Sequence, residues 1–231
     1  MNVLFDLDGT LTDPRQGILA CFKHALEALH VDPPADRELE GFIGPPLHES
    51  FARLFGPNKQ AMVKEAVALY RERFAVKGMF ENSVYPGMVE ALTQLAGRGA
   101  WLSVATVKPT VFAERIVEHF GLGEFFHRIY GSELDGTNSE KAHLLAHLLK
   151  AESLSPTGTI MIGDRAQDVL AAKANGILPI GVLWGYGSRE ELLEAGARGL
   201  CEEPRMIVDI VSSFAGGSYS LMPSAAGKRL G

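Results

Sequence analysis

The chain has 231 residues, of which 46% are hydrophobic and 22% are charged, a composition typical of globular proteins. Its 22 Lys and Arg and 28 Asp and Glu side chains give a net charge of −6, and without a basic stripe we expect no binding to a nucleic-acid polymer. No apolar run approaches the roughly 20 residues of a membrane span and no signal-peptide pattern is present, so we expect a cytoplasmic protein without a membrane partner. A monomer and a homodimer are both compatible with the sequence. Cys21 and Cys201 lack metal or redox spacing and are predicted to be buried thiols.

Short apolar runs alternate with amphipathic stretches along most of the chain. The predicted strands lie at 3–5, 102–105, 159–162 and 178–183. The predicted helices lie near 87–98, 109–121, 139–151 and 166–175. This alternation predicts an α/β fold with a doubly wound, Rossmann-like parallel sheet that is covered by helices on both faces. Sheets of this kind bind ligands at the carboxyl ends of their strands.

One segment interrupts this alternation. Between the first predicted strand and about residue 83 the apolar positions have helical spacing, and no convincing strand is present. We therefore predict an inserted helical subdomain over 15–82, within a core domain formed by 1–14 and 83–214. The last stretch, 215–231, is rich in Gly and Ser and is predicted to be a flexible tail.

Two carboxylates follow the first predicted strand, in the string D-L-D-G-T-L-T at 6–12. Asp6 and Asp8 are two residues apart and project to roughly the same side. Two like charges at the end of a buried strand need a cation or a shared proton. Asp-Gly is also a hairpin signal, but a helical pattern follows where a hairpin needs its second strand. The string therefore favours a functional site.

Two further polar residues stand near predicted strand ends or helix starts. Thr106 ends a strand just before a helix that Pro109 opens, where a hydroxyl and backbone N–H groups suit a phosphate, although Thr106 could instead cap the helix. Lys141 stands in the first turn of a helix that Ser139 is predicted to cap. A lysine opposes the helix dipole there, which a nearby anion would explain; the alternative is a solvated surface lysine.

A second acidic pair occurs in the string G-D-R-A-Q-D at 163–168, between a strand and a helix. Asp164 and Asp168 share a face if the helix has begun, and oxygen ligands of this kind suit Mg²⁺. Acids at a helix start can also simply complement the dipole. Because each of the four clusters lies at the C-terminal end of a strand or at the helix start after one, they are predicted to converge on one edge as a magnesium site for phosphoryl transfer.

The ordered set resembles the haloacid dehalogenase-like superfamily. The matching strings are D-L-D-G-T-L-T at 6–12, Thr106, Lys141 and G-D-R-A-Q-D at 163–168. The resemblance covers nearly the whole chain, is closest to the branch of phosphoglycolate phosphatases and soluble 5′-nucleotidases, and makes the insert similar to that superfamily's helical cap. It implies a Mg²⁺-dependent phosphomonoesterase that acts on a small phosphorylated metabolite.

The resemblance also implies roles for individual residues. Asp6 would be the nucleophile that forms an aspartyl-phosphate, and Asp8 the general acid and base. Mg²⁺ would be held by the Asp6 carboxylate, the Asp8 backbone carbonyl, Asp164 and Asp168. Thr106 and Lys141 would hold the phosphoryl oxygens, and Lys141 is predicted to pair with Asp6 or Asp164 before substrate arrives. The remaining predicted phosphate-side contacts are Gly9, Thr10, Val107 and Lys108. Val107 departs from the pattern, since relatives often carry Asn or Ser there.

The choice of leaving group is assigned to the insert. Its string G-F-I-G-P-P-L at 41–47 predicts a shaped loop, in which Phe42, Gly44 and Pro45 would contact substrate, although a plain interhelical connection fits the same string. A phosphoglycolate reader needs a cation for the carboxylate, and Arg15 and Arg53 are the candidates. Phosphoglycolate and 5′-nucleotides are the two leading substrates.

Three other functions fit the same strings less well. A dehalogenase has no use for an acid at Asp8. A phosphosugar mutase of this fold tends to carry Val where Thr10 stands. A non-catalytic regulator would be expected to have lost at least one of Asp6, Asp8, Lys141 and Asp164.

Overall fold

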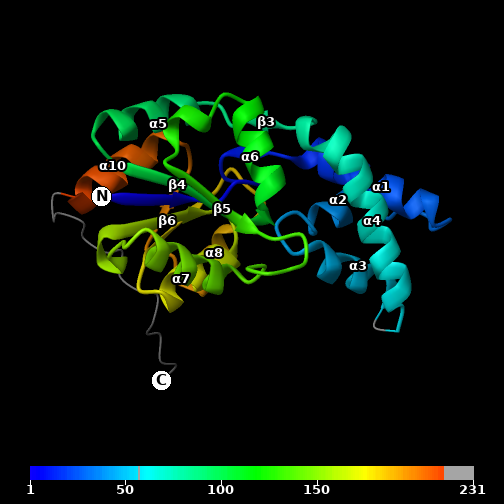
Figure 1. Cartoon of the computed structure of the whole chain (residues 1–231). Coiled ribbons are helices and arrows are strands. Elements are labelled where there is room, and N and C mark those ends of the chain that lie inside the picture. The colour runs from blue at the N-terminus through cyan, green and yellow to red at the C-terminus, as the bar shows by residue number, and fades with distance from the viewer. Residues whose placement is uncertain (57, 216–231) are drawn as a thin grey trace, which may run out of the picture.

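The computed structural model describes residues 1–56 and 58–215. Its centre is a six-stranded parallel sheet with strand order β5-β4-β1-β6-β7-β8 (Figure 1). The strands are β1 (Asn2–Phe5), β4 (Trp101–Pro109), β5 (Arg128–Ser132), β6 (Thr159–Gly163), β7 (Leu178–Val182) and β8 (Gly199–Cys201). This arrangement confirms the predicted doubly wound α/β fold.

Helices cover both faces of the sheet, because successive residues of each strand point to opposite faces. In β1, Val3 and Phe5 belong to one apolar cluster and Leu4 to another. One face carries α5 (Met88–Gly97), α6 (Thr110–His119) and α10 (Arg205–Ala215). The other carries α7 (Lys141–Ala151), α8 (Ala166–Ala174) and α9 (Arg189–Ala195). Short 3₁₀ turns complete these layers: η2 (Gly123–Phe125) and η3 (Pro156–Gly158).

The predicted strands and helices of the core are all present, with ends shifted by a few residues. The elements that the sequence did not predict are β5, β8, α9 and α10. β5 has the sequence R-I-Y-G-S, with a polar residue at each end, and β8 has only three residues, so neither contains a continuous apolar run of the kind that predicted the other strands.

Helices α1–α4 form a separate group beside the carboxyl ends of the strands, on the right in Figure 1. They are α1 (Arg15–Ala28), α2 (Asp36–Glu40), α3 (Leu47–Phe55) and α4 (Gln60–Val76). Their core forms around Phe22, whose ring lies 4.9 Å from that of Phe51 and 5.2 Å from that of Tyr70, measured between centroids. We call this group the cap helices; the domain boundaries at 15 and 82 remain a prediction.

The cap helices join the core through a narrow base. The flanking strands β2 (Thr12–Asp13) and β3 (Ser83–Val84) pair antiparallel, and η1 (Gly78–Phe80) follows α4. Gly17 of α1 packs so closely that a Cβ there would lie 1.9 Å from the Gly78 carbonyl oxygen. Arg73 holds Glu81 with two hydrogen bonds, of 2.7 and 3.1 Å. This base fixes where the cap helices leave the core.

Both cysteines are buried free thiols, as predicted. Within 1–56 and 58–215, no helix combines the length and the apolar character that crossing a bilayer requires. The predicted tail lies outside the described residues, except for Ala215, which ends α10.

Candidate active site

Three buried carboxylates meet at the carboxyl edge of the sheet. Asp6 follows β1, Asp164 follows β6, and Asp168 stands in the first turn of α8. Each offers an oxygen that lies within 4.8 Å of the others, and no His or Cys belongs to the group. Adjacent strands β1 and β6 place the first two acids side by side, as the topology of a parallel sheet dictates.

Lys141 lies between two of these carboxylates. Its ammonium nitrogen is 2.9 Å from Oδ1 of Asp6 and 2.8 Å from Oδ1 of Asp168. Of the two partners predicted for this lysine, the structure gives Asp6; the second contact is Asp168 and not Asp164. The predicted Ser139 cap is wrong, because α7 begins at Lys141 with Glu140 as its N-cap and no side-chain cap hydrogen bond. The first residue of α7 is thus a buried lysine that lies beside the acids.

The charges of this cluster are only partly balanced. Burial raises the pKa of Asp164 well above its usual range, and the neighbouring Asp168 and Asp6 add to the effect. Burial also raises the pKa of Asp168, against the opposing pull of Lys141. Although burial disfavours the ammonium, the two carboxylates together raise the pKa of Lys141. A bound cation would relieve the repulsion among the acids.

Several buried oxygens of the site have no hydrogen-bond donor. They are Oδ1 of Asp6, Asp8 and Asp168, and the Lys141 nitrogen likewise makes no hydrogen bond. Lys141 therefore contacts the two carboxylates as ion pairs, at 2.9 and 2.8 Å. Buried carboxylate oxygens without donors fit a hard cation such as Mg²⁺, which prefers oxygen ligands.

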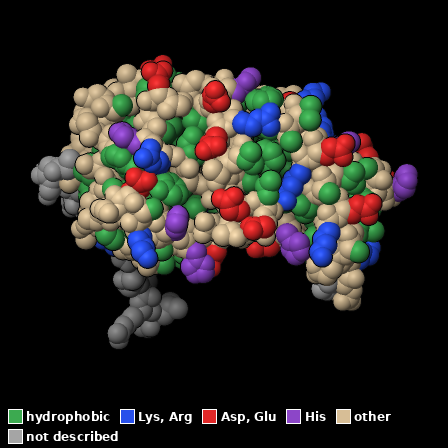
Figure 2. Space-filling model, in the orientation of Figure 1, with side chains coloured by type: hydrophobic (Ala, Val, Ile, Leu, Met, Phe, Trp, Pro, Cys, Tyr) green, Lys and Arg blue, Asp and Glu red, His purple; other side chains and the backbone are tan. Residues whose placement is uncertain are grey.

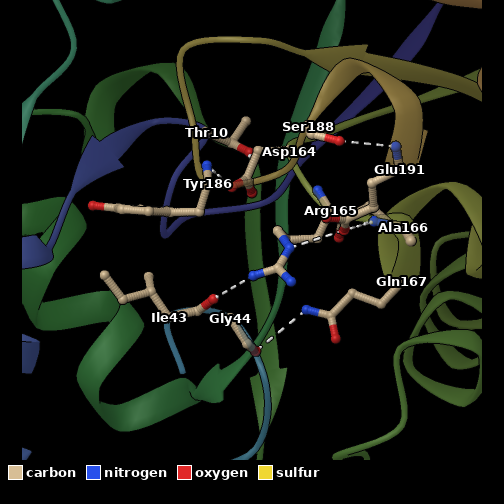
Figure 3. A network of polar contacts seen from close by, with 11 residues as sticks. Thr10, Ile43, Gly44, Asp164, Arg165, Ala166, Gln167, Tyr186, Ser188 and Glu191 are labelled. Atoms are coloured by element: carbon tan, nitrogen blue, oxygen red, sulfur yellow. Dashed lines mark hydrogen bonds and ion pairs between the residues drawn. The ribbon is translucent and has the colours of Figure 1, made fainter. Parts of the chain in front are cut away.

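Asp164 is fixed by groups on two loops (Figure 3). Its Oδ1 accepts a hydrogen bond from the Thr10 hydroxyl at 3.3 Å, and its Oδ2 accepts one from the Tyr186 backbone N–H at 2.9 Å. A Cβ at Gly185 would lie 2.4 Å from the Asp164 Cβ, and one at Gly187 would lie 1.9 Å from the Asp164 carbonyl oxygen. The string G-Y-G at 185–187 could have indicated this close approach of the backbone to Asp164, but the sequence analysis did not predict it.

Asp8 pairs with a lysine that sequence reasoning assigned to the phosphate. Lys108 Nζ lies 2.7 Å from Asp8 Oδ2 and 4.3 Å from the centre of the Phe74 ring on α4. Burial raises the pKa of Asp8, and Lys108 opposes this shift. A carboxyl group with a raised pKa is suited to donating a proton at neutral pH.

Thr106 lies within β4, and its side chain is buried. Its Oγ1 accepts a hydrogen bond from the Lys108 N–H at 3.3 Å. It does not cap the following helix, because α6 begins at Thr110 without a side-chain cap. The neighbouring Val107 carbonyl accepts a hydrogen bond from the Ser132 hydroxyl at 2.7 Å.

A cavity of about 710 Å³ opens above Asp6 and Asp8, between the core and the cap helices. The predicted substrate-binding residues that line this cavity are Thr106, Val107, Lys108, Phe42, Gly44 and Pro45. Gly9 and Thr10 lie outside the lining: the Gly9 N–H donates to the Thr12 carbonyl, and Thr10 supports Asp164.

The two predicted carboxylate readers do not line this cavity. Arg15 forms an ion pair with Glu40 at 2.5 Å, and the Arg53 guanidinium stands over the outer part of the loop, 5.2 Å from the Phe42 ring centre. Besides Lys108, the lysine and arginine side chains that line it are Lys64 and Arg71 of α4. They are seven residues apart on one helical face, a spacing that could have revealed them.

Acidic and basic side chains occur together in the region between the core and the cap helices (Figure 2). The acids that line the cavity on its outer side are Glu49, Glu133 and Asp135. The cavity is therefore a mixed-charge site and not a broad trap for anions.

Comparisons with known proteins agree with this geometry. The haloacid dehalogenase-like hydrolase family matches residues 3–182. A 5′-nucleotidase of Pseudomonas aeruginosa is 51% identical over 191 residues, which are 83% of this chain and 86% of that protein. The tyrosine-protein kinase PtkA of Mycobacterium tuberculosis is 40% identical over 185 residues, which are 80% of this chain but 62% of PtkA. The crystal structure of a predicted phosphatase from Clostridium acetobutylicum superposes with a TM-score of 0.88 and 40% identity, covering 92% of this chain and 98% of that one.

The family match spans all four motifs, from the Asp6 strand to the Asp168 helix. Close likeness to a solved phosphatase extends to the cap helices, because the superposition covers nearly the whole chain. The chain therefore belongs to the haloacid dehalogenase-like hydrolases, in their branch of phosphatases and 5′-nucleotidases.

Proposed function

We propose that this protein is a Mg²⁺-dependent phosphomonoesterase that hydrolyses small soluble phosphate esters through an aspartyl-phosphate at Asp6. One observation carries the proposal: the Asp6 carboxylate lies at the bottom of a 710 Å³ cavity, 2.9 Å from the Lys141 ammonium and grouped with two further acids. This arrangement combines a nucleophile, a cation site and an anion-binding lysine.

The residues that would hold Mg²⁺ are Asp6, Asp164, Asp168 and the backbone carbonyl of Asp8. The three carboxylates offer only oxygen ligands, and Oδ1 of Asp6 and Oδ1 of Asp168 are buried without a hydrogen bond. When bound, the cation neutralises negative charge on the phosphoryl oxygens and on the acids.

The chain's own residues account for both chemical steps. In the first, an Asp6 carboxylate oxygen bonds to phosphorus while the bond from phosphorus to the ester oxygen breaks, and Asp8 gives that oxygen its proton. In the second, water bonds to phosphorus and gives a proton to Asp8, the bond from phosphorus to Asp6 breaks, and phosphate is released. A covalent route divides one difficult displacement into two easier ones.

Other side chains hold the phosphoryl group and tune the acid. Lys141 and the Thr106 hydroxyl would bind the phosphoryl oxygens, together with the backbone N–H of Val107. Lys108 holds Asp8 in place, with its Nζ 2.7 Å from Asp8 Oδ2.

For the leaving group we favour a nucleoside, and hence a nucleoside 5′-monophosphate as substrate. A cavity of 710 Å³ is in the range of about 300–1,000 Å³ that encloses drug-sized ligands, far more than a two-carbon acid needs. Phe42, Tyr70 and Phe74 supply apolar lining, and Glu133 and Asp135 suit hydroxyl donors better than a second anion. The relative named 5′-nucleotidase supports the same choice.

Phosphoglycolate is the second candidate. The observation that favours it is Arg71, a cation of α4 that lines the cavity and that could pair with the carboxylate of a small substrate.

The test is a phosphate-release screen over a metabolite panel, with Mg²⁺ and with EDTA, using wild type and Asp6→Asn. We expect release from nucleoside monophosphates above that from phosphoglycolate, and none in EDTA or with Asp6→Asn. Absence of release from the whole panel, or equal release in EDTA, would refute the proposal.

A further inference from the structure

The loop that covers the cavity from the cap side is fastened to the loop that carries the metal-site acids. Arg165 Nη1 donates to the Ile43 carbonyl at 2.9 Å, and Gln167 Nε2 donates to the Gly44 carbonyl at 3.2 Å (Figure 3). Arg165 and Gln167 stand between Asp164 and Asp168 in the sequence. Two consecutive cap carbonyls are thus held by Arg165, the N-cap of α8, and by Gln167 in the first turn of that helix.

The Arg165 side chain is oriented before it reaches the cap. Its Nε donates to Glu191 Oε1 at 2.9 Å, and the same oxygen accepts the Ala166 N–H at 2.8 Å. Glu191 stands in the first turn of α9, where its own N–H donates to the Ser188 hydroxyl at 3.1 Å. The guanidinium therefore has a fixed direction, with one edge on α9 and the other on the cap loop.

The other contacts of the cap loop lie within the cap, where the Phe42 and Ile43 amides donate to the Leu39 and Glu40 carbonyls. Gly44 has φ +106°, a conformation that other residues rarely adopt, and Pro45 and Pro46 have no N–H to donate. Phe42 packs inward against the Phe22 ring at 5.7 Å, and Gly44 and Pro45 line the cavity. The carbonyls of residues 43 and 44 are therefore the points at which the core can hold the loop in place.

We propose that Arg165 and Gln167 are positioning residues that hold the 42–45 loop over the leaving group, with Glu191 orienting Arg165. Neither residue lines the cavity, so neither touches substrate directly. The position of the wall that selects the leaving group is then set by the start of α8 in the core as well as by the cap helices. This inference rests on the proposed function of the site, and it predicts an effect that grows with the size of the leaving group.

The experiment compares AMP, whose nucleoside would reach the loop, with acetyl phosphate, which is too short to do so. We expect Arg165→Ala and Gln167→Ala to lower kcat/KM for AMP by about tenfold and about threefold, mainly by raising KM. For acetyl phosphate the change should stay within about twofold. The matched control is Arg189→Ala, which removes an exposed arginine paired with Glu202 at the start of α9.

A conservative variant separates hydrogen bonding from charge. Glu191→Gln keeps an oxygen that can accept from Arg165 and Ala166, so its AMP kinetics should stay close to wild type, whereas Glu191→Ala should resemble Arg165→Ala. Because all these changes act on one loop, Arg165→Ala combined with Gln167→Ala should cost less than the product of the single effects.

Hydrogen exchange supplies a readout that does not depend on activity. The amides of Phe42 and Ile43 donate to Leu39 and Glu40 carbonyls, and their exchange should be faster in Arg165→Ala and Gln167→Ala than in wild type. Mg²⁺ binding, measured by calorimetry, should be unchanged in Gln167→Ala.

Three results would overturn the inference. They are unchanged exchange over 41–47 in both alanine variants, an equal loss of kcat/KM for both substrates, and a Mg²⁺ affinity change in Gln167→Ala that accounts for the kinetic loss. If wild type hydrolyses neither substrate, the proposed function fails instead, and the exchange measurement still decides the loop contacts.

Discussion

The ammonium nitrogen of Lys141 lies 2.9 Å from Oδ1 of Asp6, and the two side chains are only 3% and 4% exposed. The same nitrogen lies 2.8 Å from Asp168. Removing one member of a buried ion pair typically costs about 3–5 kcal/mol, because the other charge is left without compensation. Lys141 therefore stabilises the resting acids and stands where a phosphoryl group would need a positive charge.

We expect Lys141→Ala to lower kcat/KM by more than about tenfold, which corresponds to about 1.4 kcal/mol of lost transition-state stabilisation. Its melting temperature should also fall, and Mg²⁺ should restore part of the loss because a cation replaces the missing positive charge. Lys150→Ala changes an exposed lysine of the same helix and serves as the control. Wild-type kinetics in a folded Lys141→Ala protein would contradict the assignment.

Asp6→Asn should abolish turnover and leave the fold intact. Asparagine has nearly the same shape, and it removes one negative charge from a cluster in which burial and mutual repulsion already raise the pKa of Asp164. Phosphate release should therefore fall to background, while the melting temperature should not decrease. A folded Asp6→Asn protein with wild-type-like kcat would exclude Asp6 as the nucleophile.

Activity should depend strictly on a hard divalent cation, with Mg²⁺ best, because the site offers only oxygen ligands. Asp164→Ala should raise the Mg²⁺ concentration for half-maximal activity by at least about tenfold and weaken Mg²⁺ binding in calorimetry. It also leaves the Thr10 hydroxyl and the Tyr186 N–H without their acceptor, so stability should drop by about 1–3 kcal/mol. Full activity after exhaustive chelation would rule out the metal requirement.

Arg71 should affect the choice between the two leading substrates. Its Nη1 donates to the Leu134 carbonyl across the cavity at 3.0 Å, and its Nε is buried without an acceptor. We expect Arg71→Ala to change the ratio of kcat/KM for AMP and phosphoglycolate by at least about fivefold, since Arg71 lines the cavity and its cationic guanidinium can pair with the carboxylate of phosphoglycolate. Phe42→Ala should shift the ratio toward phosphoglycolate, because it removes an apolar wall.

Two comparisons sharpen the Arg71 measurement. Arg53→Ala should have the smaller effect, because Arg53 contacts Phe42 from outside the cavity. Glu72→Ala alters an exposed neighbour on α4 and is the control for damage to the helix. A constant substrate ratio in both Arg71→Ala and Phe42→Ala would mean that this wall does not set specificity.

Glu81 should make the stability of the cap base depend on pH. Hydrogen bonds from Arg73 lower the pKa of Glu81 below its ordinary value of 4.5. A lowered pKa in the folded state means that the stabilisation is present above the unfolded-state pKa and is lost as the pH falls through the folded-state pKa. Glu81→Gln should therefore destabilise the protein by about 1 kcal/mol at pH 7, and this effect should be smaller at a second, acidic pH below 4.5, as the pH falls toward and through the folded-state pKa. Equal destabilisation at both pH values would contradict this account.

Much of the fold and of the chemistry could be predicted from local sequence patterns. The apolar runs at 3–5 and 159–162 predicted β1 and β6 because a strand buried on both faces needs continuous apolar residues. Once these strands are parallel neighbours, Asp6 and Asp164 must lie at the same edge, so the topology alone brings them together. The helical spacing of apolar residues over 15–82 also predicted an insert of helices, because apolar residues repeat at the helical period where a helix buries one face.

Other features depend on how segments that are far apart in the sequence pack against one another. The second partner of Lys141, the Gly185–Gly187 approach to Asp164 and the Arg71 contact with Leu134 all join segments that no local periodicity relates. The Ser139 prediction failed because the helix start was set by burial of Lys141 among the acids and not by capping propensity.

The sequence was enough to predict the alternation of β1, β4, β6 and β7 with α5–α8 and the residue types at these strand ends, because these follow from the periods of burial and from the chemistry of single side chains. The tertiary structure alone decided that Arg15 and Arg53 point to other partners, that Lys64 and Arg71 line the cavity, and that Arg165 reaches Ile43. The physical reason is that these contacts depend on the distance and orientation between the cap helices and the core, and these are set by packing over the whole molecule.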